Sequence, residues 1–248
     1  MRRLFTLWRR EVEAYLYSSM AYFVMAYFLL IMGASFGWVL RMLSKGASGT
    51  DVIQELFGSG FFWLAVLMVV PIITMRLFAE ERKAGTIETL MTAPVRSRDL
   101  VLAKFLGAFT FYVLLWLPTL AYVFIIEHLA EGKIAVDLGA MACAYFGTFV
   151  IGAAFIAVGV FLSSFAENQI VAAISTYAVL LLFFFCSFLP WITESPFLKQ
   201  AFRRVSGVIH MEDFSRGALQ SQPIVLYLSV TLLLLYMTSR LLETRDWR

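Results

Sequence analysis

Residues 138–165 read LGAMACAYFGTFVIGAAFIAVGVFLSSF, a stretch without any acidic or basic side chain. Because a helix needs roughly 20 apolar residues to cross the hydrocarbon of a bilayer, this stretch predicts a membrane span with length to spare for tilting. Five further stretches have the same character, with no charge near their centres. The six predicted spans are Met20–Leu40, Gly58–Met75, Leu102–Ile126, Leu138–Phe165, Ile170–Pro190 and Ile224–Leu242.

The composition of the whole chain agrees with a membrane protein. Of the 248 residues, 61% are hydrophobic and 15% are charged, whereas a soluble domain is nearer to half apolar and a quarter charged. The sequence therefore predicts an all-α, polytopic membrane protein with one transmembrane domain over residues 1–248. The net charge of +3 gives no reason to expect nucleic acid as a partner.

The flanks of the spans predict which side of the membrane each loop faces. With a cytoplasmic N-terminus, most of the 20 lysine and arginine residues fall in cytoplasmic segments, as the positive-inside rule requires. Both termini are then cytoplasmic, and the loop over residues 191–223 is extracytoplasmic despite its basic residues. We expect short helices in that loop, which carries the aromatic residues Trp191, Phe197, Phe202 and Phe214.

Residues 1–17 predict an amphipathic helix in the membrane interface. Apolar side chains from Leu4 to Leu16 recur on one face at helical spacing, and arginines occupy the other face. Glu11 is the acidic residue that intrudes on the apolar side. A basic amphipathic helix beside a span binds the lipid interface, and it can also contact a partner protein; the two roles are compatible.

The polar segment over residues 78–100 predicts a short cytoplasmic helix between the second and third spans. We expect Gly85 to end the helix that leaves the membrane, and Thr86 to cap the next helix with Glu88 in its first turn. The apolar face of this helix and its end come from Ile87, Leu90, Met91 and Pro94. On physical grounds alone, an ordinary solvated loop is the better interpretation of this segment.

The identity of the residues changes that interpretation. The stretch AEERKAGTIETLMTAPVRSRDLVLAKFLGA (79–108) resembles the permeases of ABC-2 type transporters, and SSFAENQIVAAI (163–174) resembles their tight cytoplasmic turn, here Glu167, Asn168 and Gln169. The N- and C-terminal stretches are similar to the subgroup of gliding-motility-associated ABC permeases. The positions matching the family pattern are Glu81, Gly85, Thr86, Ile87, Glu88, Leu90, Pro94, Val95 and Lys104.

The resemblance implies a fold, a partner and a location. Subunits of this family have six spans, pair as dimers and dock on two ABC ATPase subunits in the bacterial cytoplasmic membrane. The resemblance makes Gly85–Thr92 the coupling helix that contacts the ATPase, and it leaves the substrate open. The expected contacts with the ATPase are Glu81, Gly85, Thr86, Ile87, Glu88, Leu90, Met91 and Pro94.

Other functions of the chain remain as alternatives. No Walker A pattern occurs in the sequence, so we expect no enzyme activity and no cofactor in this chain, with ATP bound by the partner subunit. No acid or base lies in the middle of a span, which argues against a proton-coupled secondary transporter. A secondary transporter and a non-transporting membrane scaffold stay as the alternatives to an ABC permease.

Three smaller patterns have structural interpretations. The pair Glu80 and Glu81 lacks the arginine spacing and the intramembrane histidine of a glutamate protease, so we expect these carboxylates to pair with Arg82, Lys83 or a partner subunit. His128 and His210 are interpreted as polar loop residues rather than metal ligands. Gly33 and Gly37 form a GxxxG pattern that serves helix packing, either within the chain or in a dimer.

Overall fold

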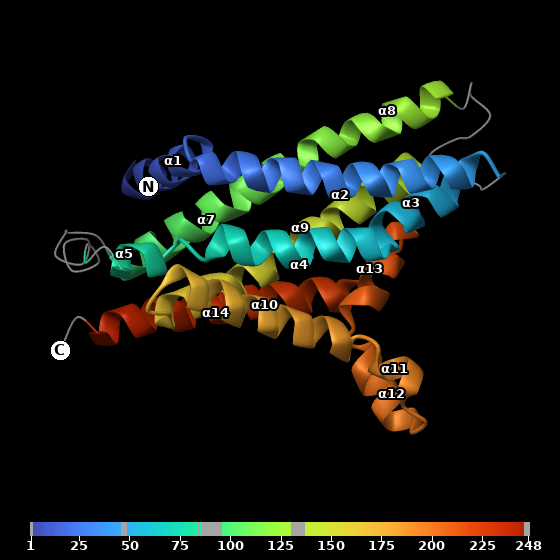
Figure 1. The fold of residues 1–248 in the computed structure, drawn as a ribbon. Helices are drawn as coiled ribbons and strands as arrows, with labels where there is room; N and C mark the ends of the chain where they lie inside the picture. Colours follow the sequence, from blue (N-terminus) through green and yellow to red (C-terminus); the bar gives the residue numbers. More distant parts are fainter. Residues whose placement is uncertain (1, 46–48, 84, 86–95, 130–136, 246–248) are drawn as a thin grey trace.

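The computed structural model describes residues 2–45, 49–83, 85, 96–129 and 137–245. All regular structure in these residues is helical (Figure 1), and six segments of them are long and apolar enough to cross a membrane, which confirms the predicted fold class. The helices are α1 (Arg2–Leu16), α2 (Ser19–Leu43), α3 (Gly49–Gly58), α4 (Gly60–Thr74), α5 (Ala79–Lys83), α7 (Ser97–Trp116), α8 (Leu120–Leu129), α9 (Leu138–Phe165), α10 (Gln169–Cys186), α11 (Leu189–Ile192), α12 (Pro196–Arg203), α13 (Gly207–Ser215) and α14 (Ser221–Arg245).

The second span is longer than its sequence predicts. The apolar run indicates Gly58–Met75, but the candidate span covers Val52–Arg82 and includes α4 and most of α3 and α5. The charge of Glu55 interrupts the apolar run, and its carboxylate accepts a hydrogen bond from Trp38 Nε1 at 3.1 Å. The neighbouring α3 residue Phe57 is buried because its ring packs against Phe62, Trp116 and Tyr145.

The two prolines within predicted spans act differently. At Pro118 the third span is interrupted: α7 ends at Trp116, and a short 3-10 turn leads into α8. The hydroxyl of Thr119 donates to the Trp116 carbonyl at 2.7 Å, so the break retains a hydrogen bond. Pro71 lies inside α4 without ending it.

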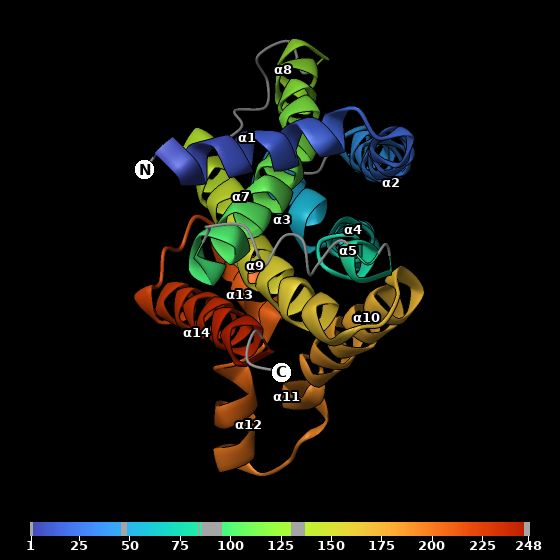
Figure 2. The ribbon, with the colours of Figure 1, turned by 90° about the vertical axis from the view of Figure 1, so that its left-hand side faces the viewer.

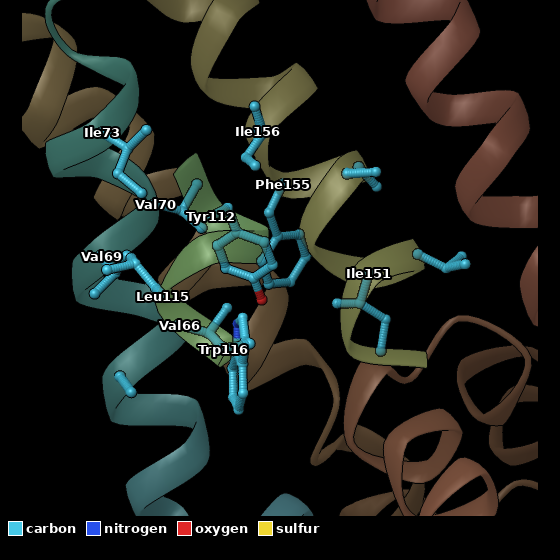
Figure 3. Close-up of a cluster of buried hydrophobic side chains, with 14 of the residues drawn as sticks. Val66, Val69, Val70, Ile73, Tyr112, Leu115, Trp116, Ile151, Phe155 and Ile156 are labelled. Atoms are coloured by element: carbon cyan, nitrogen blue, oxygen red, sulfur yellow. The ribbon is translucent and has the colours of Figure 1, made fainter. Parts of the chain in front are cut away.

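α9 lies at the centre of the bundle (Figure 2), in contact with α4, α7, α10, α13 and α14. Close approach is possible because α9 carries glycines where its neighbours press against it: a Cβ at Gly152 would meet the Tyr112 ring, and one at Gly147 would meet Phe214. Figure 3 shows side chains of α4, α7 and α9 together in the core, including Val70, Tyr112 and Phe155.

The two ends of the bundle are built differently. Both ends of the chain, α5 and the turn between α9 and α10 lie at one end, and α3 and α11–α13 lie at the other (Figure 1). The predicted loop 191–223 does form short helices, and they differ in burial. Phe197 on α12 is 79% exposed, whereas Phe214 on α13 is 1% exposed because it packs against α9.

Candidate functional site

The helix that leaves the second span ends where the sequence predicts. α5 ends at Lys83, and Gly85 has a φ of 69°, a left-handed conformation that favours glycine. The backbone N–H of Gly85 donates to the Arg82 carbonyl at 3.1 Å. The remaining residues of the predicted coupling helix lie outside the described residues, so that helix stays a prediction. The predicted ATPase contacts that lie outside the described residues are Thr86, Ile87, Glu88, Leu90, Met91 and Pro94.

The predicted cytoplasmic turn lies directly beside α5. Its helix α10 is capped by Asn168, whose side chain accepts a hydrogen bond from Val171 N at 2.9 Å, and Glu167 and Gln169 flank the cap. The Arg82 guanidinium donates to the carbonyls of residues 164, 165 and 166 at 2.6, 2.9 and 3.1 Å. These carbonyls lie at the C-terminus of α9, where a cation is favoured.

A second connection joins α5 to α9 from inside the bundle. The Ser163 hydroxyl accepts hydrogen bonds from the backbone N–H groups of Phe78 and Ala79 at 3.2 and 3.3 Å. Ser163 is fully buried, so these bonds are shielded from water. The structure therefore shows that α5 is bound to the end of α9. The sequence predicted only that these two segments lie on the same side of the membrane.

A buried lysine ties these elements to the N-terminal helix. The side chain of Lys104 on α7 is 3% exposed, and its ammonium contacts Glu81 Oε1 at 2.7 Å and Glu11 Oε1 at 3.1 Å. It also lies 5.3 Å from the centre of the Phe78 ring. We call Glu11, Glu81 and Lys104 the Lys104 cluster. It joins α1, α5 and α7, since each element supplies one of the three charges.

The structure gives the two glutamates partners that the sequence did not predict. Glu80 pairs with Arg76, one helical turn earlier, through two hydrogen bonds of 2.8 and 3.2 Å, and Glu81 pairs with Lys104. The physical reason is spacing: residues four apart face each other on a helix, whereas neighbouring residues do not. Arg82 points instead to the end of α9.

The N-terminal helix forms as predicted and packs along α7. Trp8 Nε1 donates to Thr110 Oγ1 at 3.1 Å, and a Cβ at Gly107 would lie 2.7 Å from Glu11 Cβ. Tyr15 donates to the carbonyl of Ile73 at 2.7 Å, and burial raises the pKa of its phenol, so the group remains a neutral donor. Glu11 lies on the apolar face because its carboxylate meets Lys104 there.

A polar cavity of about 270 Å³ opens between α1, the end of the second span and α7. Its wall includes the Lys104 cluster and the Arg76–Glu80 pair. Sequence reasoning missed this site, although two signs were present: an acid on the apolar face of an amphipathic helix, and a lysine in the first turns of a span. The charged residues of the wall are Arg10, Glu11, Arg76, Glu80, Glu81 and Lys104.

The other candidate residues have different surroundings. A Cβ at Gly37 would meet no atom within 4 Å, and one at Gly33 would come only within 3.9 Å of the Tyr122 hydroxyl, so packing within the chain does not require this pair. His210 is not the polar loop residue that the sequence suggests: it lies on α13, 4% exposed, with Nδ1 3.0 Å from the Tyr227 hydroxyl. In the described part of the chain, no group of three possible ligands could hold a metal ion.

The fold and these connections define a polytopic helical membrane protein in which the N-terminal helix and the segment after the second span are bound to the spans. The chain belongs to the ABC-2 transporter family, since the family model described as "ABC-2 family transporter protein" matches residues 12–246. Members of this family are membrane permease components of ABC transporters. No curated protein matches the chain.

Proposed function

We propose that this chain is the permease subunit of an ABC exporter that works as a dimer and uses ATP hydrolysed by a separate ATPase subunit. The observation that supports this most directly is the set of bonds from Arg82 to the end of α9. These bonds join the segment that leads into the predicted coupling helix to the start of the predicted second cytoplasmic turn. We also propose kinship with the gliding-motility-associated permeases, on the resemblance of both ends of the chain.

The connections suggest how a push from the ATPase would reach the membrane. A force on residues 86–95 acts on α5 before it and on α7 after it. Because Arg82 and Ser163 bind α5 to α9, the force also reaches the central helix of the bundle. The second, third and fourth spans would therefore respond together.

The Lys104 cluster extends this path to the interfacial helix. Glu81 lies just before the predicted coupling helix, and its lysine partner also holds Glu11 of α1. A charge pair shielded from water resists separation, because each ion would have to be solvated again. We infer that α1 moves with α5 and α7 during the transport cycle.

The test is co-purification with an ABC ATPase encoded in the same genome, followed by measurement of the ATPase rate. We expect the wild type to form a stable complex, and Glu88→Lys and Ile87→Asp to lose the complex or its stimulated ATPase activity. Glu194→Lys and Ile192→Asp make the same changes at exposed residues of the opposite end. These matched controls should behave as the wild type.

The outcomes separate the alternatives. If no ATPase of that genome binds the wild-type chain, the ABC proposal fails and a secondary transporter or a scaffold becomes the better explanation. If the complex forms but the two coupling variants and their controls are equally active, the assignment of residues 85–92 fails while the permease proposal stands.

A further inference from the structure

A second polar pocket lies at the end of the bundle away from the chain termini. It has a volume of about 330 Å³ and is formed by the end of α12, by α13 and by the start of α14. Arg203 and Arg204 line it from one side, and His210 and Asp213 line it from another. The pocket has no part in the connections that surround α5.

The charges of this pocket favour an anion. Arg203 and Arg204 are exposed, and neither forms a salt bridge with any carboxylate in the described part of the chain. The carboxylate in the lining, Asp213, accepts a hydrogen bond from Gln220 at 3.3 Å. The lining therefore has two positively charged arginines and one negatively charged aspartate. Side-chain amides add further hydrogen-bond donors to the lining, namely Gln200, Gln220 and Gln222.

The wall of the pocket is held by bonds between three helices. Ser206 caps α13 and donates to the Ser187 carbonyl beyond α10 at 3.0 Å, and the Gly207 N–H donates to Ser187 Oγ at 3.1 Å. The buried ring of His210 meets the Tyr227 hydroxyl of α14 at 3.0 Å. A ligand would thus enter a site whose wall is already positioned, which limits the entropy lost on binding.

Apolar surface adjoins the pocket on α14. Gln222 lines the pocket, and Val225, Leu228 and Leu232 follow on the same side of the helix at spacings of three and four residues. Their exposed fractions are 61%, 47% and 67%. A polar site at the start of a lipid-facing apolar stripe matches a molecule with a charged head and a hydrocarbon tail.

The helix α12 places the pocket at the level of the membrane surface. It starts four residues after the fifth span ends and has no buried residue. Phe197 and Leu198 are exposed on its apolar face, while Gln200 and Arg203 on its other face line the pocket. In Figure 1, α11 and α12 extend sideways from the bundle, as expected of a helix lying in the plane of the interface.

We propose that this pocket binds the phosphate headgroup of an anionic phospholipid from the leaflet opposite the chain termini. Arg203 and Arg204 would hold the phosphate, since guanidinium groups pair with phosphate oxygens through parallel hydrogen bonds. The acyl chains would lie along Val225, Leu228 and Leu232. The proposal requires only that the chain spans a membrane. It is therefore independent of the proposal that the chain binds an ATPase subunit.

The test is native mass spectrometry of the full chain in detergent, titrated with phosphatidylglycerol or with phosphatidylcholine. We expect the first phosphatidylglycerol to bind the wild type more tightly than phosphatidylcholine does. The double variant Arg203→Gln/Arg204→Gln should weaken binding of phosphatidylglycerol about tenfold, the scale of two lost ion pairs at exposed side chains. Arg41→Gln removes an exposed arginine at the end of α2, at the same end of the bundle but outside the pocket, and should leave the affinity unchanged.

A third variant moves the affinity in the opposite direction. Asp213→Asn removes the acid from the pocket wall and should strengthen binding of phosphatidylglycerol, which loss of folding would not do. The proposal is overturned if the double variant binds phosphatidylglycerol as the wild type does, if Arg41→Gln weakens binding equally, or if the wild type does not distinguish the two lipids.

Discussion

At the scale of single residues, burying the charged side chain of Lys104 lowers the stability of the fold unless carboxylates pair with it. An ammonium that is 3% exposed has lost nearly all of its water, and two carboxylates from elements far apart in sequence replace that water. Removing one member weakens the charge compensation of the other two, whereas replacing all three by neutral groups is far less damaging. The cluster therefore acts as one unit for stability.

The substitution Lys104→Met tests that unit. It keeps the length of the side chain but leaves two carboxylates facing each other, so we expect the free energy of unfolding to fall by about 3 kcal/mol. The measurement is thermal unfolding in detergent. The control Arg9→Met breaks an exposed pair with Glu13 and should leave the melting temperature nearly unchanged, because water and salt screen such a pair. Equal effects of the two variants would contradict the role of burial.

His210 gives a prediction for pH. Burial lowers the pKa of its imidazole, an effect that Asp213 opposes; Tyr227, Arg203 and Arg204 also border the ring or its pocket. Below about pH 6.5 the unfolded chain binds a proton that the folded chain resists. The stability due to this group is thus complete above that pH and is lost as the pH falls toward the lowered pKa.

The measurement for His210 is the melting temperature in detergent at pH 7.5 and pH 5.5. We expect the wild type to melt lower at pH 5.5, and His210→Asn to show a smaller difference between the two values. His128→Asn changes the other, exposed histidine and should keep the wild-type difference. A difference that persists undiminished in His210→Asn would show that other groups cause it.

Residue roles were harder to predict from sequence than residue positions. The sequence placed Glu11 on the apolar face of its helix, and it matched Lys104 to a family pattern. It could not join them, because the contact depends on how α1 packs on α7, 93 positions away along the chain. His210 was misjudged for a related reason: its loop is polar in composition, but α13 packs against α9.

At the scale of helices, the close contacts of α9 identify glycines that the sequence pattern overlooked. The GxxxG pair of α2 has open space at Gly37, whereas a Cβ at Gly159 on α9 would overlap the side chain of Thr74 on α4. Thr74 is fully buried and donates to the Val70 carbonyl at 2.9 Å, so it cannot easily turn away. Close packing in the described part of this chain depends on which side chain of the adjacent helix faces a glycine, and not on the spacing of the glycines along the sequence.

The variant Gly159→Ala is expected to lower the free energy of unfolding by about 2 kcal/mol, the usual cost of overpacking. Gly37→Ala should change it by less than about 0.5 kcal/mol, as at a site without close neighbours. Thermal unfolding in detergent compares the two. If Gly37 instead serves a dimer, Gly37→Ala will leave melting intact but reduce the dimer fraction in size-exclusion chromatography.

The existence and order of the spans followed from the sequence, and so did both ends of the fourth span, whereas the ends of the other spans differ from their predictions. Apolar runs located all six spans, because lipid imposes a length on each of them. The second span was underestimated because hydropathy treats Glu55 as a stop, although Trp38 satisfies it. The break at Pro118 lies inside a stretch that its apolar run predicts as one span, because hydropathy does not register the missing N–H and the bulky ring of a proline.

At the scale of the whole molecule, the two ends of the bundle differ in kind. The end with both termini carries charged side chains tied to backbone and to each other, as suits an end that receives force from a partner. The opposite end carries α12, whose apolar side chains meet no part of the described chain closely enough to be buried. This asymmetry agrees with a protein partner at the end with the termini and with contact between α12 and lipid at the opposite end.

The orientation of the bundle is the last prediction. The positive-inside rule places the end with both termini in the cytoplasm, and a membrane-impermeant maleimide can test this in intact bacterial cells. In a background with Cys143 and Cys186 replaced by alanine, we expect a cysteine at Glu194 to react in intact cells. A cysteine at Arg9, exposed at the opposite end, should react only after the membrane is permeabilised. The reverse pattern would place residues 86–95 out of reach of any cytoplasmic ATPase, and the proposed mechanism would fail with it.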